Sequence, residues 1–179
     1  MAEALKLVAY DPDWPRQFRA ERDRIAPVLG ALALRIDHNG STAIPGMAAK
    51  PVIDIQISVA ALHAMASYTA VLVQLGYTHR PHPDDAFAPF FYRPRVWPHT
   101  HHVHVVQAGG DEERRTLAFR DYLRDHDALA REYEALKHWL APRYNAEEFT
   151  ARQAYAEAKG DFIGDVVARA RAEGYPRGV

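Results

Sequence analysis

Alternating hydrophobic and polar residues mark positions 52–59 as the clearest strand in the chain. Successive side chains of a strand point to opposite faces, so one face here is apolar and the other carries an aspartate. A charge beside apolar neighbours is costly unless it is paired. The first face holds Ile53, Ile55, Ile57 and Val59, and the second holds Val52, Asp54, Gln56 and Ser58.

Other segments show the periodicities of further strands and of amphipathic helices. The expected strands and helices do not alternate strictly along the chain. We therefore predict one α+β domain over residues 1–179, with a mixed sheet covered by helices and a C-terminal helical layer. Residues 39–51 read as loop and residues 77–98 as irregular apart from one strand. The expected strands are 5–9, 34–38, 90–93 and 101–107, and the expected helices are 14–29, 61–75, 112–126, 127–141 and 151–172.

The composition excludes several classes of protein. The chain has no cysteine, which rules out disulfides and thiolate chemistry. The net charge of -1 gives no general attraction to nucleic acid or to an anionic membrane. We find no apolar run of membrane-spanning length and no signal-peptide pattern, and therefore expect a cytoplasmic location.

Histidine is unusually frequent, with ten residues. Histidine titrates near pH 6.5 in its ordinary state. We therefore expect the 79–104 segment to gain positive charge as the pH falls toward 6. The histidines of this segment are His79, His82, His99, His101, His102 and His104.

A Gly-Ser turn follows the strand expected at 34–38. Gly40 and Ser41 allow backbone N–H groups and a hydroxyl to approach an anion closely, and Thr42 and Lys50 can add to such a site. A turn of this kind is more often only a turn. Lys50 is either a phosphate contact or the partner of Asp54.

Two imidazoles lie on one face of the strand expected at 101–107. His102 and His104 are about 7 Å apart along such a strand and can share one metal or anionic ligand. A zinc site needs at least a third ligand, and Asp54 supplies it if the two strands are close. The alternatives are a solvated strand face and a structural Asp54 that accepts hydrogen bonds.

Two cationic positions on the C-terminal helices complete the candidates. Arg120 and Arg124 are four residues apart and share one helix face. Lys159 interrupts an otherwise apolar stripe. Its side chain either extends along the surface to water or points into a cleft and meets an anion.

Taken together, these segments resemble the GrpB family. The resemblance extends in order over nearly the whole chain. The matching segments are Tyr10-Asp-Pro-Asp-Trp-Pro-Arg-Gln-Phe18, His38-Asn-Gly-Ser-Thr-Ala-Ile-Pro-Gly46, Lys50-Pro-Val-Ile-Asp-Ile55, His101-His-Val-His-Val-Val106, Phe119-Arg-Asp-Tyr-Leu123, Leu136-Lys137, and Tyr155 through Lys159 to Phe162.

The resemblance implies a nucleotidyltransferase-like fold. The family is also similar to domains that are fused to dephospho-coenzyme A kinases in some bacteria. In that superfamily a Gly-Ser turn precedes a strand with an Asp-x-Asp metal pair, and a later strand gives a third carboxylate. Here Asp54 fits the first position, but Gln56 occupies the second and His102 and His104 stand on the later strand. Asn39 also replaces a branched aliphatic residue.

These departures weaken the case for magnesium, which prefers several carboxylate ligands. Imidazole suits zinc, nickel, copper or iron better. A divalent metal held by Asp54, His102 and His104 remains one expectation, and no organic cofactor is implied. Asp54 and His104 are the candidate catalytic groups.

Two functions follow from the sequence. The first is a nucleotide or phosphate binder, or a nucleotidyl transferase with an atypical metal site. Its expected ligand contacts are Gly40, Ser41, Thr42, Lys50, Arg120 and Lys159. The second is a catalytically inactive accessory or interaction domain that uses the same fold. The fold by itself does not decide between them.

Overall fold

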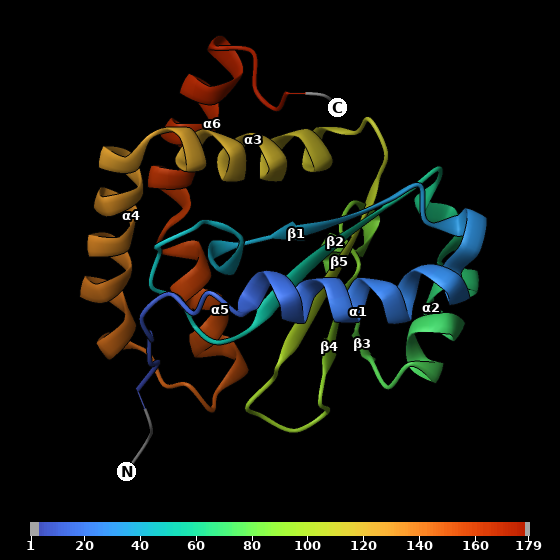
Figure 1. Cartoon of the computed structure of the whole chain (residues 1–179). Coiled ribbons are helices and arrows are strands. Elements are labelled where there is room, and N and C mark those ends of the chain that lie inside the picture. Colours follow the sequence, from blue (N-terminus) through green and yellow to red (C-terminus); the bar gives the residue numbers. More distant parts are fainter. Residues whose placement is uncertain (1–3, 178–179) are drawn as a thin grey trace.

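A five-stranded mixed sheet forms the centre of the computed structural model, which describes residues 4–177 (Figure 1). The strand order is β1-β2-β5-β4-β3. β2 and β5 are parallel, and the other neighbouring pairs are antiparallel. The expected α+β fold with a mixed sheet is confirmed. The strands are β1 (Arg35–Asn39), β2 (Ile53–Val59), β3 (Thr78–Arg80), β4 (Phe90–Arg93) and β5 (His101–Gln107).

Helices α1 (Trp14–Leu29) and α2 (Met65–Gln74) cover one face of the sheet, where the main apolar core lies. The alternating isoleucines of β2 pack against them, and Ile55 and Ile57 are fully buried. Burying such side chains contributes about 1.5–3 kcal/mol each. The apolar half of the β2 pattern therefore anchors the sheet to these two helices.

The C-terminal helices form a layer on the other side of the strands (Figure 1). They are α3 (Asp111–Asp125), α4 (Asp127–Leu140), α5 (Phe149–Glu157) and α6 (Gly160–Ala172). The polar half of β2 faces this layer. The Ser58 hydroxyl donates to the buried Glu113 of α3, and the Thr116 hydroxyl donates to Gln56 Oε1 at 2.5 Å.

Three expectations for the elements differ from the structure. Residues 5–9 form no strand; Val8 makes only an isolated bridge to Ala49, because no neighbouring strand is available to extend the pairing. The helix expected over 151–172 is two helices that meet at Lys159, next to Gly160, whose backbone freedom disfavours a continuous helix. β3 lies in the segment expected to be irregular.

In the described part of the chain, five short 3₁₀ helices connect these elements. None of the helices within residues 4–177 combines the length and the apolar character needed to cross a membrane. The 3₁₀ helices are η1 (Gly30–Leu32), η2 (Ser41–Ala43), η3 (Leu62–Ala64), η4 (Pro83–Ala86) and η5 (Ala141–Arg143).

Candidate functional site

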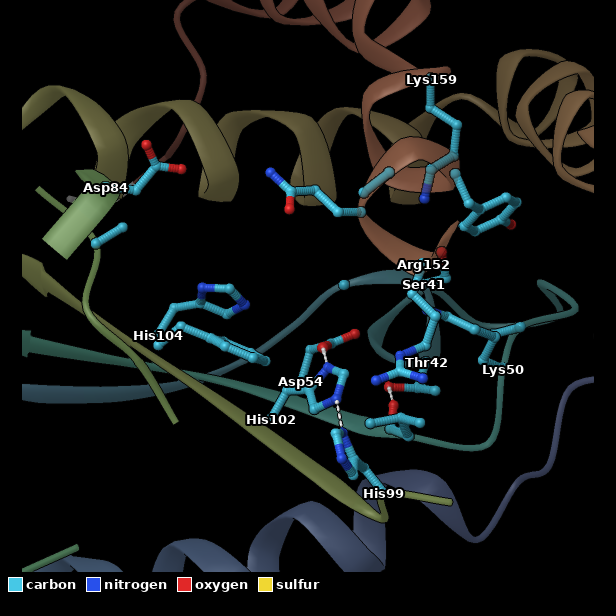
Figure 2. A pocket seen from close by; sticks show the side chains of 18 of the residues that line it. Ser41, Thr42, Lys50, Asp54, Asp84, His99, His102, His104, Arg152 and Lys159 are labelled. Atoms are coloured by element: carbon cyan, nitrogen blue, oxygen red, sulfur yellow. Dashed lines mark hydrogen bonds and ion pairs between the residues drawn. The ribbon is translucent and has the colours of Figure 1, made fainter. Parts of the chain in front are cut away.

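A cavity of about 520 Å³ lies between the polar face of the sheet and the C-terminal helices. Its walls come from η2, β2, β4 and β5 and from α3, α4 and α5, so segments from most of the chain contribute. This volume is in the range of small-molecule sites. Figure 2 shows a close view of the side chains that line it.

Asp54 and His102 face each other across the parallel pair of β2 and β5. Asp54 Oδ1 lies 3.3 Å from His102 Nδ1, and His102 Nε2 lies 3.1 Å from His99 Nδ1 (Figure 2). The structure thus joins Asp54 to the His-x-His strand, as the sequence pattern allowed. It also adds His99, which the sequence analysis did not select and which follows the cis Trp97-Pro98 bond.

Burial opposes the negative charge of Asp54, but the hydrogen bond from His102 and the nearby His104 and Lys50 outweigh it. The pKa of Asp54 therefore lies below its ordinary value. His104 sits opposite Gln56 in the strand register, and its ring centre is 4.9 Å from that of Phe90. Burial lowers the pKa of His104, so this imidazole is neutral at pH 7.

The expected charging of the histidine-rich segment near pH 6 is wrong for His99 and His101 as well as for His104. Burial lowers the pKa of His99 and of His101 to about 4. A buried imidazole loses hydration of its charged form, so it stays neutral until the solution is more acidic.

The Gly-Ser turn brings its backbone against Asp54. Gly40 has φ 66° and ψ -171°, a conformation that other residues rarely adopt. Ser41 lines the cavity next to the Tyr133 hydroxyl. Thr42 also lines it, but its hydroxyl is 3.0 Å from His38 Nε2, and the side chain is buried. Both hydroxyls thus have a partner in the protein, and Ser41 is the less buried of the two.

Three lysines line the same cavity. The ammonium groups of Lys50 and Lys159 lie 5.4 and 4.2 Å from the centre of the Tyr155 ring. Lys137, on α4, is buried and donates to the Ala48 carbonyl. Lys50 and Lys159 were expected at a ligand site from the sequence; Lys137 was not, although it lies in a segment that matches the GrpB pattern.

Proximity of the three lysines changes their protonation. Burial and the charges of Lys50 and Lys137 lower the pKa of Lys159 to about 7, while Asp54 acts in the opposite direction. Burial also lowers the pKa of Lys137 to about 8; Glu134 opposes this and Lys50 adds to it. The cavity therefore holds cations that an incoming anion would stabilise.

Arg120 lies outside the cavity, contrary to its selection as a ligand contact. Its Nε donates to Asp121 at 2.7 Å, and its Nη1 donates to the His38 carbonyl at 3.0 Å. Its partners are all in the protein, and the residue is buried. Arg120 holds β1 against α3, and we leave it out of the site.

The residues at the metal position do not fit a divalent ion. Both ring nitrogens of His102 already have partners in Asp54 and His99. Gln56 is fully buried, and its Oε1 accepts from Asn39 at 3.1 Å and from Thr116. Within residues 4–177, no three His, Asp or Glu side chains are placed to hold one metal. Asn39 and Gln56 are thus hydrogen-bond partners of each other.

Comparison with known proteins gives a family match over most of the chain. The family described as GrpB protein matches residues 4–169. A UPF0157 protein of Halalkalibacterium halodurans is 37% identical over 94% of this chain and 84% of its own length. A dephospho-CoA kinase of Mycolicibacterium paratuberculosis is 33% identical over 93% of this chain, which spans 46% of that longer protein.

Solved structures agree on the fold. The crystal structure of GrpB from Enterococcus faecalis superposes with a TM-score of 0.78 and 29% identity, and covers 94% of this chain and 98% of that one. Cid1, solved in complex with its short product ApU, gives a TM-score of 0.52 and 13% identity over 73% of this chain and 42% of its own. The likeness to Cid1 concerns the fold alone.

Proposed function

Because this chain belongs to the GrpB family and has a nucleotidyltransferase-like fold, we propose that its cavity binds a nucleotide or a similar small phosphate-bearing molecule. The proposal concerns binding. Nucleotidyl transfer in the superfamily depends on metal ions that lower the charge of the phosphates. The side chains around Asp54 do not fit that requirement, so transfer is not part of the proposal.

The observation that carries the proposal is the gathering of Lys50, Lys137 and Lys159 around one end of the cavity. Ammonium groups placed together in a partly desolvated site repel one another unless an anion joins them. Ser41 adds a hydroxyl at the same end (Figure 2). The ammonium groups and this hydroxyl are hydrogen-bond donors of the kind that bind phosphate oxygens.

Asp54 would orient the part of the ligand that carries hydroxyl groups. Its Oδ1 is held by His102, and its low pKa keeps it ionised at pH 7. An ionised carboxylate accepts hydrogen bonds from hydroxyls such as those of a ribose. His104 lies on the side of the cavity away from Lys50 and Lys159 (Figure 2). Its ring and that of Phe90, with centres 4.9 Å apart, would contact the remainder of the molecule.

The test is a thermal-unfolding screen with ATP, GTP, CTP, dephospho-coenzyme A and inorganic phosphate, each with magnesium or with EDTA. The mycobacterial relative's name is the reason for including dephospho-coenzyme A. A ligand at a hundredfold excess over its dissociation constant stabilises the native state by about 2.7 kcal/mol. We expect such stabilisation with at least one of these compounds.

Two variants and one control make the screen specific. Lys159→Gln and Asp54→Asn should reduce the ligand-induced shift, while Lys6→Gln, which removes an exposed charge elsewhere, should not. If no compound stabilises the wild-type protein under any condition, the proposed function is wrong.

A further inference from the structure

We propose that Lys50, Lys137 and Lys159 form a subsite for a chain of two or three phosphates, and that this subsite works without a divalent cation. The inference rests on the proposed function and names its ligand class, the nucleoside di- and triphosphates. It differs from the proposed function in assigning the phosphates to three named ammonium groups in place of a metal.

The distribution of lysine in the chain is the first argument. Among 22 lysines and arginines only four are lysines, namely Lys6, Lys50, Lys137 and Lys159, and three of these four line the cavity. Lysine carries a compact point charge, whereas arginine offers a planar fork. Arg80, Arg115 and Arg152 also line the cavity, so half of its cationic side chains are lysines, a far larger share than in the chain as a whole.

The surroundings of these lysines are the second argument. Tyr155 presents its ring to both Lys50 and Lys159, so their ammonium groups face an aromatic surface rather than a carboxylate. The ammonium of Lys137 likewise lies over an aromatic ring, 5.1 Å from the centre of the Tyr133 ring. The rings leave the hydrogen-bonding capacity of Lys50 and Lys159 directed to a ligand in the cavity.

Charge balance indicates how many phosphates are bound. One terminal phosphate carries about -1.5 to -2 charges at pH 7. The cavity is lined by three lysines and by Arg80, Arg115 and Arg152, against the carboxylates of Asp54, Asp84 and Glu112. The excess of up to three positive charges is balanced by a second or third phosphate. Asp54 is ionised and offsets part of the positive charge on Lys50 and Lys159.

The metal position supplies the last argument. Superfamily members hold metal ions on an Asp-x-Asp pair, but here Gln56 is buried against Asn39 and Thr116. The positive charge that would come from a metal is instead present in the lysine side chains. A phosphate chain at Lys50 and Lys159 would leave its other end directed toward His104 and Asp84, which lie on the opposite side in Figure 2.

The experiment uses protein labelled with [¹³C]lysine, in which four side-chain signals report on the four lysines separately. Inorganic triphosphate is added in the presence of EDTA. We expect the signals of Lys50, Lys137 and Lys159 to shift with one common dissociation constant and that of Lys6 to stay in place. Lys159→Gln should weaken triphosphate binding at least tenfold, with Lys6→Gln as the matched control.

Circular dichroism of each variant establishes that it is folded, and Lys159→Arg gives a second test at unchanged charge. Weak binding by Lys159→Arg supports a need for the compact ammonium. The inference is overturned if triphosphate binds only with magnesium, or if it leaves the three signals unmoved. In that case, if a nucleotide binds in the presence of magnesium and Asp54→Asn weakens this binding, the proposed function still holds. Failure of all phosphates to bind would overturn both.

Discussion

Gly40 lies directly against the carboxylate of Asp54. A β-carbon added to Gly40 would be 2.2 Å from Asp54 Oδ2, far inside van der Waals contact. The positive φ of Gly40 makes a side chain unfavourable there for a second reason. The Gly-Ser turn and the strand aspartate are therefore a single unit, in which the turn sets the position of the carboxylate in the cavity.

Replacing Gly40 with alanine should move Asp54 and weaken ligand binding. The matched control is Gly30→Ala, since Gly30 also has a positive φ but a β-carbon there meets nothing within 4 Å. We expect both variants to lose about 1–3 kcal/mol of stability from backbone strain. Urea unfolding and nucleotide titration separate the two effects, because only Gly40→Ala should also lose affinity. Unchanged affinity in folded Gly40→Ala would refute the role given to the turn.

Triphosphate binding should weaken as the pH rises from 7 to 8.5. Burial is the largest cause that lowers the pKa of Lys159 to about 7; Lys50 and Lys137 add to the effect, and Asp54 opposes it. A bound anion favours the protonated amine, so above pH 7 binding must take up a proton. The affinity should fall by up to roughly tenfold per pH unit. Calorimetry in buffers of different ionisation enthalpy measures this uptake.

Lys159→Gln is the control for this pH dependence. The variant should bind more weakly at pH 7 and show a flatter profile, with the remaining slope due to Lys137, whose pKa is about 8. An affinity that is constant or increases over this pH range in the wild-type protein would count against the lysine subsite.

Acid should destabilise the protein through His38. Burial is the largest cause that lowers its pKa to about 4; Arg124 and Arg120 add to the effect, and Asp54 opposes it. The unfolded state takes up a proton near pH 6.5, so this stability is present above that pH and is lost as the pH falls toward 4. At pH 5 the loss from His38 is about 2 kcal/mol.

Urea unfolding at pH 7 and pH 5 checks this value. His38→Gln should be less stable than the wild type at pH 7, because it loses the stacking on Phe18 and the contact with Thr42. Its further loss on acidification should be smaller by about 2 kcal/mol. Equal losses in both proteins would show that His38 is not the group that titrates.

Gln56 should be coupled energetically to Thr116. The hydrogen bond between them joins β2 to α3. In a double-mutant cycle with Gln56→Met and Thr116→Val, each single change removes the hydrogen bond between the two side chains. We expect a coupling of about 0.5–1.5 kcal/mol from chemical denaturation. Strict additivity would mean that the contact does not hold the two elements together.

Local patterns predicted much of the fold. The alternation in β2 indicated which face is buried, and the residues 101–107 were expected as the strand that became β5. These signals depend on neighbouring residues alone. β3 was missed because three residues carry little periodicity and pair only with β4. The break at Lys159 was missed because a side-chain stripe continues across it.

The site was less accessible to sequence reasoning. Asp54 and His102 could be placed on compatible faces, but their contact depends on the parallel pairing of two distant strands. Lys137 belonged to a recognised segment, and the chain's scarcity of lysine was a usable signal that was not used. Arg120 was misplaced, because its spacing from Arg124 gives the helix face but not the direction in which that face points.

A crystal structure of the protein grown with a nucleoside triphosphate and EDTA examines the phosphate cavity most directly. The structure should show phosphate oxygens about 2.7–3.2 Å from the ammonium nitrogens of Lys50 and Lys159, with the nucleoside directed toward His104. A triphosphate bound elsewhere on the molecule, with these lysines still facing only Tyr155, would contradict the account.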